Sequence, residues 1–210
     1  MPLHIYEKYR AHPEINRILD AVNQVNADIF SACHGQFHAA FVVEKTAHIL
    51  TLLSYSARVV ELGKIAALLH DIGNIAGRKK HPRKGAALAA VFLEDETELS
   101  PEEKTIIIQA IEDHSKGKNI QSAVGAALLI ADKIDISRER VLPRPNLDSW
   151  HKNLLEIKMA DVTIVGKTMK IHYTTTRAFS RELLESDYEK GFRLPRKAAA
   201  FLGYGCEFIS

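Results

Sequence analysis

The sequence predicts a mainly α-helical fold: a helical bundle followed by a small C-terminal α+β appendage that contains a β-hairpin. From residue 13 to about residue 140, apolar residues recur at the three- and four-residue spacing of a buried helix face. Beyond residue 148, the segment "DVTIVGKTMKIHY" alternates apolar and polar residues around a Gly-Lys pair, which predicts a β-hairpin. We therefore expect a core domain over residues 1–145 and an appendage over residues 146–210.

Each helix of the expected bundle has its own signal. Ile15, Ile18 and Val22 belong to a first apolar stripe, and a second begins at Phe37. The almost wholly apolar "ELGKIAALLHDIG" predicts a short central helix that ends at Gly73. The next expected helices are "SPEEKTIIIQAIEDH", which opens with a serine cap, a proline and a glutamate three residues after the cap, and "SAVGAALLIADKID".

The appendage should return to helix after the hairpin. The segments "SRELLESDYEKGF" (residues 180–192) and "PRKAAAFLGY" (residues 195–204) have helical spacing. Trp150 and the other aromatic residues of the appendage are expected to pack rather than to stack on a ligand.

Composition excludes several classes of protein. The chain has 210 residues, of which 46% are hydrophobic and 26% charged, as in ordinary folded proteins. Its 28 basic and 26 acidic residues leave a formal net charge of +2, which argues against general nucleic-acid binding. Cys33 and Cys206 lack the spacing of a zinc site and suit a reducing compartment. No apolar run approaches the roughly 20 residues that cross a bilayer, so we expect a cytoplasmic protein without membrane contact.

Histidine and aspartate residues fall at suggestive positions on these helices. His70 and Asp71 stand side by side where the central apolar helix stops. Helix ends in a bundle can converge, and imidazole with carboxylate is the ligand set of divalent Zn, Mn or Fe. Neighbouring residues of a helix point about 100° apart, so His70 and Asp71 suit two ions better than one, with Asp71 as the bridge. Further candidate ligands are His38, His81, His114 and Asp132.

The order and local context of these residues resemble the HD-domain superfamily of metal-dependent phosphohydrolases, whose dinuclear members carry H…HD…H…H…D. The resemblance is carried by "FHAAFVVEKTA", "LLHDIGN", "HPRKGAALA", "EDHSKG" and "LLIADKID", over roughly residues 38–135. Within the superfamily, "HPRKGA" and the lone histidine of "HSKG" are most similar to the bacterial diadenosine-tetraphosphate hydrolase branch.

The resemblance implies two divalent metal ions per chain, with Asp71 as the catalytic bridge. The implied ligands of the first ion are His38, His70, Asp71 and Asp132, and those of the second are Asp71, His81 and His114. The resemblance does not distinguish among Fe, Mn, Mg, Zn and Ni.

The chemistry of such a site favours a phosphate. Four neutral imidazoles and two carboxylates contribute −2 against the +4 of two divalent ions, leaving about +2 to attract a phosphate dianion. A water whose pKa is lowered toward about 7 by the metals can attack phosphorus. We expect a small phosphorylated substrate, a nucleotide above all, and the sequence is compatible with a homodimer. The basic residues expected to bind its phosphates are Arg78, Arg83, Lys84, Lys116 and Lys133.

Simpler interpretations exist for each of these residues. A lone histidine on a helix is more often a core or surface side chain, and a basic run is more often solvated surface. His34 lies four residues before His38, but "CHG" is typical of a loop, so His38 is preferred as the ligand. Asp113 and Asp135 either orient imidazoles or are exposed.

Two other functions stay open. One is an HD-fold di-iron oxygenase, and the other is a non-catalytic nucleotide-binding module. An iron chromophore that responds to oxygen would indicate the oxygenase, whereas colourless, metal-dependent phosphate release would indicate a hydrolase.

Overall fold

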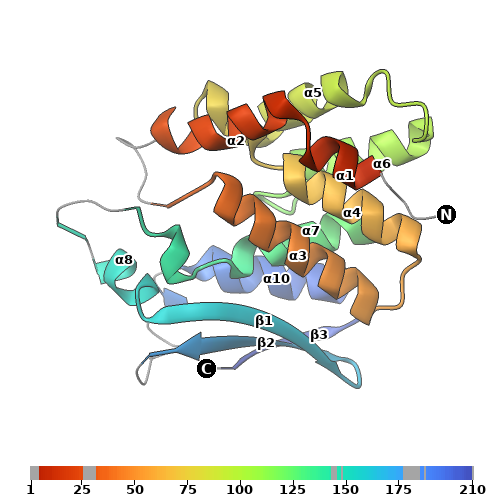
Figure 1. Cartoon of the computed structure of the whole chain (residues 1–210). Helices are drawn as coiled ribbons and strands as arrows, with labels where there is room; N and C mark the ends of the chain where they lie inside the picture. The colour runs from red at the N-terminus through yellow and green to blue at the C-terminus, as the bar shows by residue number, and fades with distance from the viewer. Residues whose placement is uncertain are drawn as a thin grey trace.

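A helical bundle and a three-stranded sheet along one side of it make up the structure (Figure 1). The computed structural model describes residues 5–25, 32–142, 146–147, 149–176, 185–186 and 188–209. The bundle contains α1 (Ile5–Arg10), α2 (Pro13–Val25), α3 (Gln36–Leu52), α4 (Ala57–Leu69), η1 (Ile72–Ala76), α5 (His81–Leu93), α6 (Pro101–Asp113), α7 (Ala123–Ile134) and η2 (Arg138–Arg140). The C-terminal part contains α8 (Ser149–Leu154), β1 (Ile157–Val165), β2 (Thr168–Thr175), α10 (Glu189–Phe201) and β3 (Gly205–Ile209). The predicted mainly α fold with a small C-terminal α+β part is confirmed.

Helices α4 and α7 form the centre of the bundle. Their sequences are apolar on most sides, and most of their residues are buried. Such helices need neighbours on every side. They contact each other, and α3 and α6 each pack against both of them. The polar side chains at the ends of these helices are therefore held inside the protein.

Serine caps start three of the bundle helices. Ser56 accepts a hydrogen bond from the Val59 amide at the start of α4, and Ser122 accepts one from the Gly125 amide at the start of α7. Ser100 and Glu103 cap each other's backbone amides at the start of α6, as the sequence predicts. A cap of this kind stabilises a helix by about 1 kcal/mol.

Gly73 does not end a helix, contrary to the sequence prediction. Helix α4 ends at Leu69, and Gly73 lies within η1. A Cβ atom at Gly73 would lie 2.2 Å from the carbonyl oxygen of His81 and 2.3 Å from the amide nitrogen of Gly85. Glycine is required here because η1 packs directly on the first turns of α5, and this packing positions His81.

Gly73→Ala is expected to destabilise the fold by roughly 1–3 kcal/mol, because the added methyl group overlaps backbone atoms of α5. Gly125→Ala is the matched control: its Cβ would meet nothing closer than 3.6 Å, and alanine favours helix. Urea unfolding of both variants measures the difference. Equal stability of Gly73→Ala and the wild type would contradict the close packing of η1 on α5.

The predicted β-hairpin is present as β1 and β2. Its two-residue turn is Gly166-Lys167, and Gly166 has a φ of 58°, which glycine adopts without strain. Val162 pairs with Ile171 on the two antiparallel strands. The sequence did not predict β3, which pairs parallel with β2. A five-residue strand has little periodicity of its own, and it forms here because α10 returns the chain to the free edge of β2.

The C-terminal part packs onto the bundle. Helix α10 contacts α7 and β3, and β1 contacts α3 (Figure 1). Phe192 of α10 and Phe208 of β3 are buried with ring centroids 4.4 Å apart, in the same apolar core as the bundle helices. The predicted domain boundary after residue 145 lies next to residues 143–145 and 148, which are outside the described residues. Residues 180–184 and 187 of the predicted helix over residues 180–192 are also outside the described residues.

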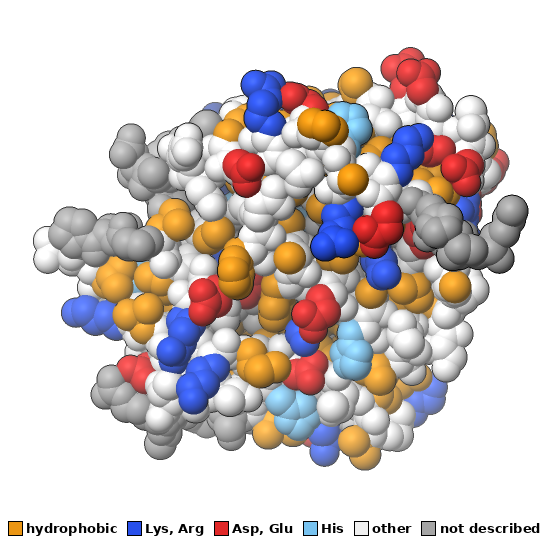
Figure 2. Space-filling view, in the orientation of Figure 1, with side chains coloured by type: hydrophobic (Ala, Val, Ile, Leu, Met, Phe, Trp, Pro, Cys, Tyr) orange, Lys and Arg blue, Asp and Glu red, His pale blue; other side chains and the backbone are white. Residues whose placement is uncertain are grey.

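The surface in Figure 2 mixes both signs of charge. On this face lysine and arginine side chains lie among aspartate and glutamate side chains rather than in one patch. Among the described residues, the helices all fall short of the length and apolar character that a membrane span needs.

Candidate metal centre

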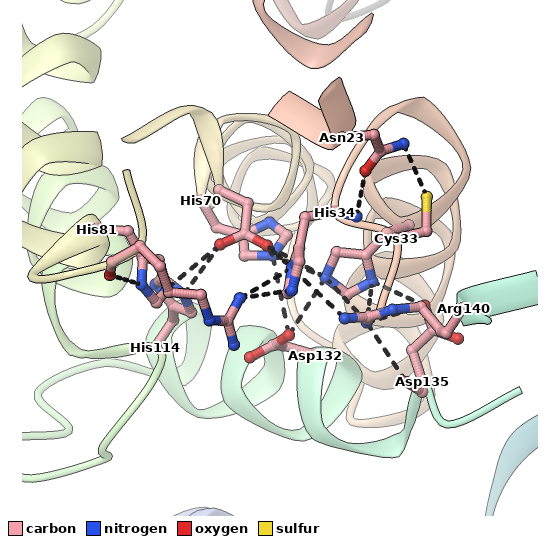
Figure 3. A network of polar contacts seen from close by, with 12 residues as sticks. Asn23, Cys33, His34, His70, His81, His114, Asp132, Asp135 and Arg140 are labelled. Atoms are coloured by element: carbon pink, nitrogen blue, oxygen red, sulfur yellow. Dashed lines mark hydrogen bonds and ion pairs between the residues drawn. The ribbon is translucent and has the colours of Figure 1, made fainter. Parts of the chain in front are cut away.

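Six side chains singled out in the sequence lie together in the interior, where five segments of the bundle converge (Figure 3). Two of the side chains lie in the first turns of α3 and α5. Three others belong to the residues directly after α4 and α6, and the sixth lies within α7. His81 is the first residue of α5. All six side chains are buried: His38, His70, Asp71, His81, His114 and Asp132.

The two oxygens of Asp71 face two different groups of imidazoles. Oδ2 lies 3.4 Å from Nε2 of His70 and 3.6 Å from Nε2 of His38. Oδ1 lies 3.4 Å from Nε2 of His81 and 3.6 Å from Nε2 of His114. Asp71 thus lies between the two groups of imidazoles.

Within each group the imidazole nitrogens lie close together. His38 Nε2 is 3.1 Å from His70 Nε2 and 3.3 Å from Oδ1 of Asp132. His81 Nε2 is 3.2 Å from His114 Nε2. Two nitrogens that each lie about 2.1 Å from one metal ion, at octahedral or tetrahedral angles, are about 3.0–3.4 Å apart. The spacing in both groups fits a shared ion.

Hydrogen bonds at the other ring nitrogen fix the tautomer of three of these histidines, His70, His81 and His114. Nδ1 of His70, His81 and His114 donates to the backbone oxygen three residues earlier, at distances of 2.7, 3.0 and 2.7 Å. Nδ1 of His38 lies 2.7 Å from Oδ2 of Asp135, a carboxylate that needs a donor. Nε2 of His70, His81 and His114 therefore presents a lone pair, as a metal ligand must.

The electrostatics of the cluster also suit a cation. Burial lowers the pKa of His81 to about 4, which keeps its imidazole neutral. Burial works to raise the pKa of Asp71, but the imidazoles of His70 and His34 hold that pKa well below its usual range. Oδ1 of Asp71 is buried and has no hydrogen-bond partner among the described residues. A buried, ionised oxygen without a donor is costly unless a cation faces it.

His34 also belongs to this cluster, although the sequence favours His38 as the ligand. It lies in the loop before α3, as expected, but its buried side chain points inward and its Nδ1 is 2.8 Å from Oδ2 of Asp71. Its Nε2 contacts the guanidinium of Arg78. The Nε2 of His34 thus faces a guanidinium, whereas Nε2 of the other histidines in the cluster faces an imidazole. Burial lowers the pKa of His34 to about 3, so it is a neutral donor to Asp71. The only sequence feature that could have indicated the place of His34 in the cluster is its spacing of four residues from His38.

A second contact that the sequence did not indicate comes from Arg140 in η2. Its buried guanidinium lies 3.4 Å from Oδ2 of Asp135 and 2.6 Å from Nδ1 of His38. Of the two candidate orienting carboxylates, Asp135 contacts an imidazole. Asp113 instead accepts hydrogen bonds from the backbone amides of Lys118 and Asn119.

A cleft of about 430 Å³ opens beside the cluster and contains several of the expected substrate-binding residues. Arg78, Lys116 and Lys133 line it. The structure does not bring Arg83 and Lys84 to this cleft, because Arg83 is exposed on α5 and Nζ of Lys84 donates to the backbone oxygens of Ala76 and Gly77. Lys133 forms an ion pair with Asp132, which raises the pKa of the lysine against the effect of burial.

Comparison with known proteins gives one family. The HD domain family matches residues 41–146, which is just over half of the 210 residues and includes five of the six clustered side chains. A crystal structure of a predicted HD superfamily hydrolase from an uncultured Thermotogales bacterium is 24% identical, with a TM-score of 0.46 over 64% of this chain and 75% of that chain. No curated protein matches the chain. The chain belongs to the HD domain family, and its buried histidine and aspartate side chains form clusters able to hold a divalent metal ion.

Proposed function

We propose that this protein is a metal-dependent phosphohydrolase that cleaves a nucleotide or another small phosphoester. One observation carries the proposal: two groups of imidazoles face the two oxygens of Asp71, beside a cleft that arginine and lysine side chains line. Such a site can hold two cations and a phosphate group at the same time.

Two ions would be held by the two groups of side chains. His38, His70, Asp71 and Asp132 would hold the first ion, and Asp71, His81 and His114 would hold the second. When bound, the ions supply a water of lowered pKa and neutralise negative charge at phosphorus. The chain itself orients the ligands, since the Nδ1 bonds of the four imidazoles hold each ring in place.

The cations of the cleft would bind the substrate's phosphate oxygens. Arg78 and Lys116 line the cleft, and an arginine guanidinium can bind two phosphate oxygens at once. Lys133 is paired with Asp132, so its first role is to stabilise that carboxylate, whose pKa it lowers against the effect of burial.

Phosphate release tests the proposal. The purified protein is stripped of metal, reloaded separately with Mn, Fe, Mg, Zn or Ni, and incubated with mono-, di- and polyphosphorylated nucleotides. We expect turnover that a chelator abolishes and that proceeds equally well without oxygen. Product formation that depends on oxygen, together with an iron chromophore, would contradict the hydrolase and indicate a di-iron oxygenase. Nucleotide binding without turnover under any metal would indicate a non-catalytic module.

Arg78→Ala is expected to raise the KM for a nucleotide polyphosphate about tenfold, which corresponds to the loss of one charge-assisted hydrogen bond at a partly exposed site. The KM for a monophosphate should change less, and metal content should stay the same. Arg83→Ala is the matched control, since Arg83 is exposed and lies outside the cleft. Equal effects of both variants would mean that Arg78 does not contact the substrate.

A further inference from the structure

The cleft beside the metal cluster is lined in part by residues from outside the HD domain match. The match ends at residue 146, and the later residues of the lining are Trp150, His151, Leu154, Tyr188 and Lys190. The C-terminal part therefore completes the cavity in which the substrate would bind.

Two aromatic rings stand out in this lining. Trp150 of α8 and Tyr188, just before α10, lie with ring centroids 5.0 Å apart at an interplanar angle of 45°. Both side chains are half-buried, so each ring packs against the protein and keeps some accessible surface. Contact between the rings restrains both of them, as in other tilted aromatic pairs.

Helix α8 holds the indole of Trp150 in position. On the same short helix, the side chains of His151 and Leu154 are 5% and 2% exposed, which anchors α8 in the protein. Trp150 is more exposed than either and lines the cleft. A half-buried indole on an anchored helix provides a flat surface for a planar ligand.

The lining thus combines two kinds of recognition. The Asp71 cluster with Arg78 and Lys116 suits a phosphate, whereas an aromatic pair suits a flat π-electron ring. The cleft volume of about 430 Å³ falls within the range of small-molecule sites. A nucleotide carries both chemical groups on one molecule, and a sugar phosphate carries only the first.

The sequence predicts that Trp150 and the other aromatic residues of the appendage only pack. We propose instead that Trp150 and Tyr188 bind the base of a nucleotide substrate by stacking, so that the C-terminal part selects nucleotides over phosphate esters without an aromatic ring. This inference rests on the proposed phosphohydrolase function for the identity of the site. Stacking on an aromatic side chain is tolerant of base identity, so purine and pyrimidine nucleotides should both bind.

Trp150 gives a direct test because it is the single tryptophan of the chain. Its fluorescence in the metal-loaded protein is followed during titration with adenosine 5′-monophosphate and, separately, with ribose 5-phosphate. We expect saturable quenching by the nucleotide and none by the sugar phosphate. Tyr188→Ala should weaken the nucleotide affinity measured by quenching about tenfold, the loss of one stacking contact.

Calorimetry extends the test to the indole itself. Trp150→Ala should weaken adenosine 5′-monophosphate binding about tenfold, Trp150→Phe should restore most of the affinity, and ribose 5-phosphate binding should be the same in all variants. Phe201→Ala is the control, because Phe201 is an exposed aromatic residue on α10 that does not line the cleft.

The outcomes separate this inference from the function on which it rests. Quenching by the nucleotide with no phosphate release from any substrate would support the stacking role and overturn the hydrolase. Phosphate release with no quenching, and with equal affinity for the nucleotide and the sugar phosphate, would support the hydrolase and overturn the stacking role.

Discussion

Asp71→Ala should abolish phosphate release and lower the amount of bound metal. The two oxygens of Asp71 face separate imidazole groups, so its loss removes one ligand from each proposed ion and leaves two cations without a carboxylate between them. Loss of a residue that only orients a ligand lowers metal affinity or activity 10–100-fold. Loss of a shared ligand should therefore lower the activity about 10³-fold or more. Metal analysis and turnover measure the two effects.

The helical fold of this variant should persist. Asp71 is a buried charge, and its removal takes away a desolvation penalty together with its contacts, so circular dichroism should be unchanged. Asp95→Ala is the control, since Asp95 is an exposed aspartate between α5 and α6. Full activity of Asp71→Ala with wild-type metal content would exclude the bridging role.

His114→Ala should leave a protein with one tightly bound ion per chain. Its activity should fall by at least about 10²-fold, which is more than the loss of an orienting residue costs. His114 contacts His81 and Oδ1 of Asp71, so only the second group of ligands is affected. Asp132→Ala should weaken the other ion, because Asp132 contacts His38. Metal titration of the stripped protein, with turnover measured at each point, distinguishes the two variants.

The control for this pair is His172→Ala. His172 lies on β2, where its Nε2 contacts the hydroxyl of Thr163, outside the cluster. Its replacement should leave two ions bound. A wild-type protein that saturates with a single ion would overturn the dinuclear proposal, and a mononuclear site of His38, His70, Asp71 and Asp132 would replace it.

Local features of the fold could be predicted from the sequence. Helical periodicity, the capping pair of Ser100 and Glu103, and the turn at Gly166 are each encoded within a few neighbouring residues. The candidate ligands could also be predicted, because each stands in a recognisable short segment at a helix end or within a helix. The structure brings all six of these side chains together, and their roles as ligands stay predictions.

Other features depended on the tertiary structure. His34 contacts a residue 37 positions away, and Arg140 contacts His38 across 102 positions. Gly73 marks the close approach of η1 to α5 rather than a helix end. Periodicity shows which face of a helix is buried, but the residues that this face meets depend on how the helices pack. The same packing brings Arg78, but not Arg83, to the cleft, although both belong to one basic segment.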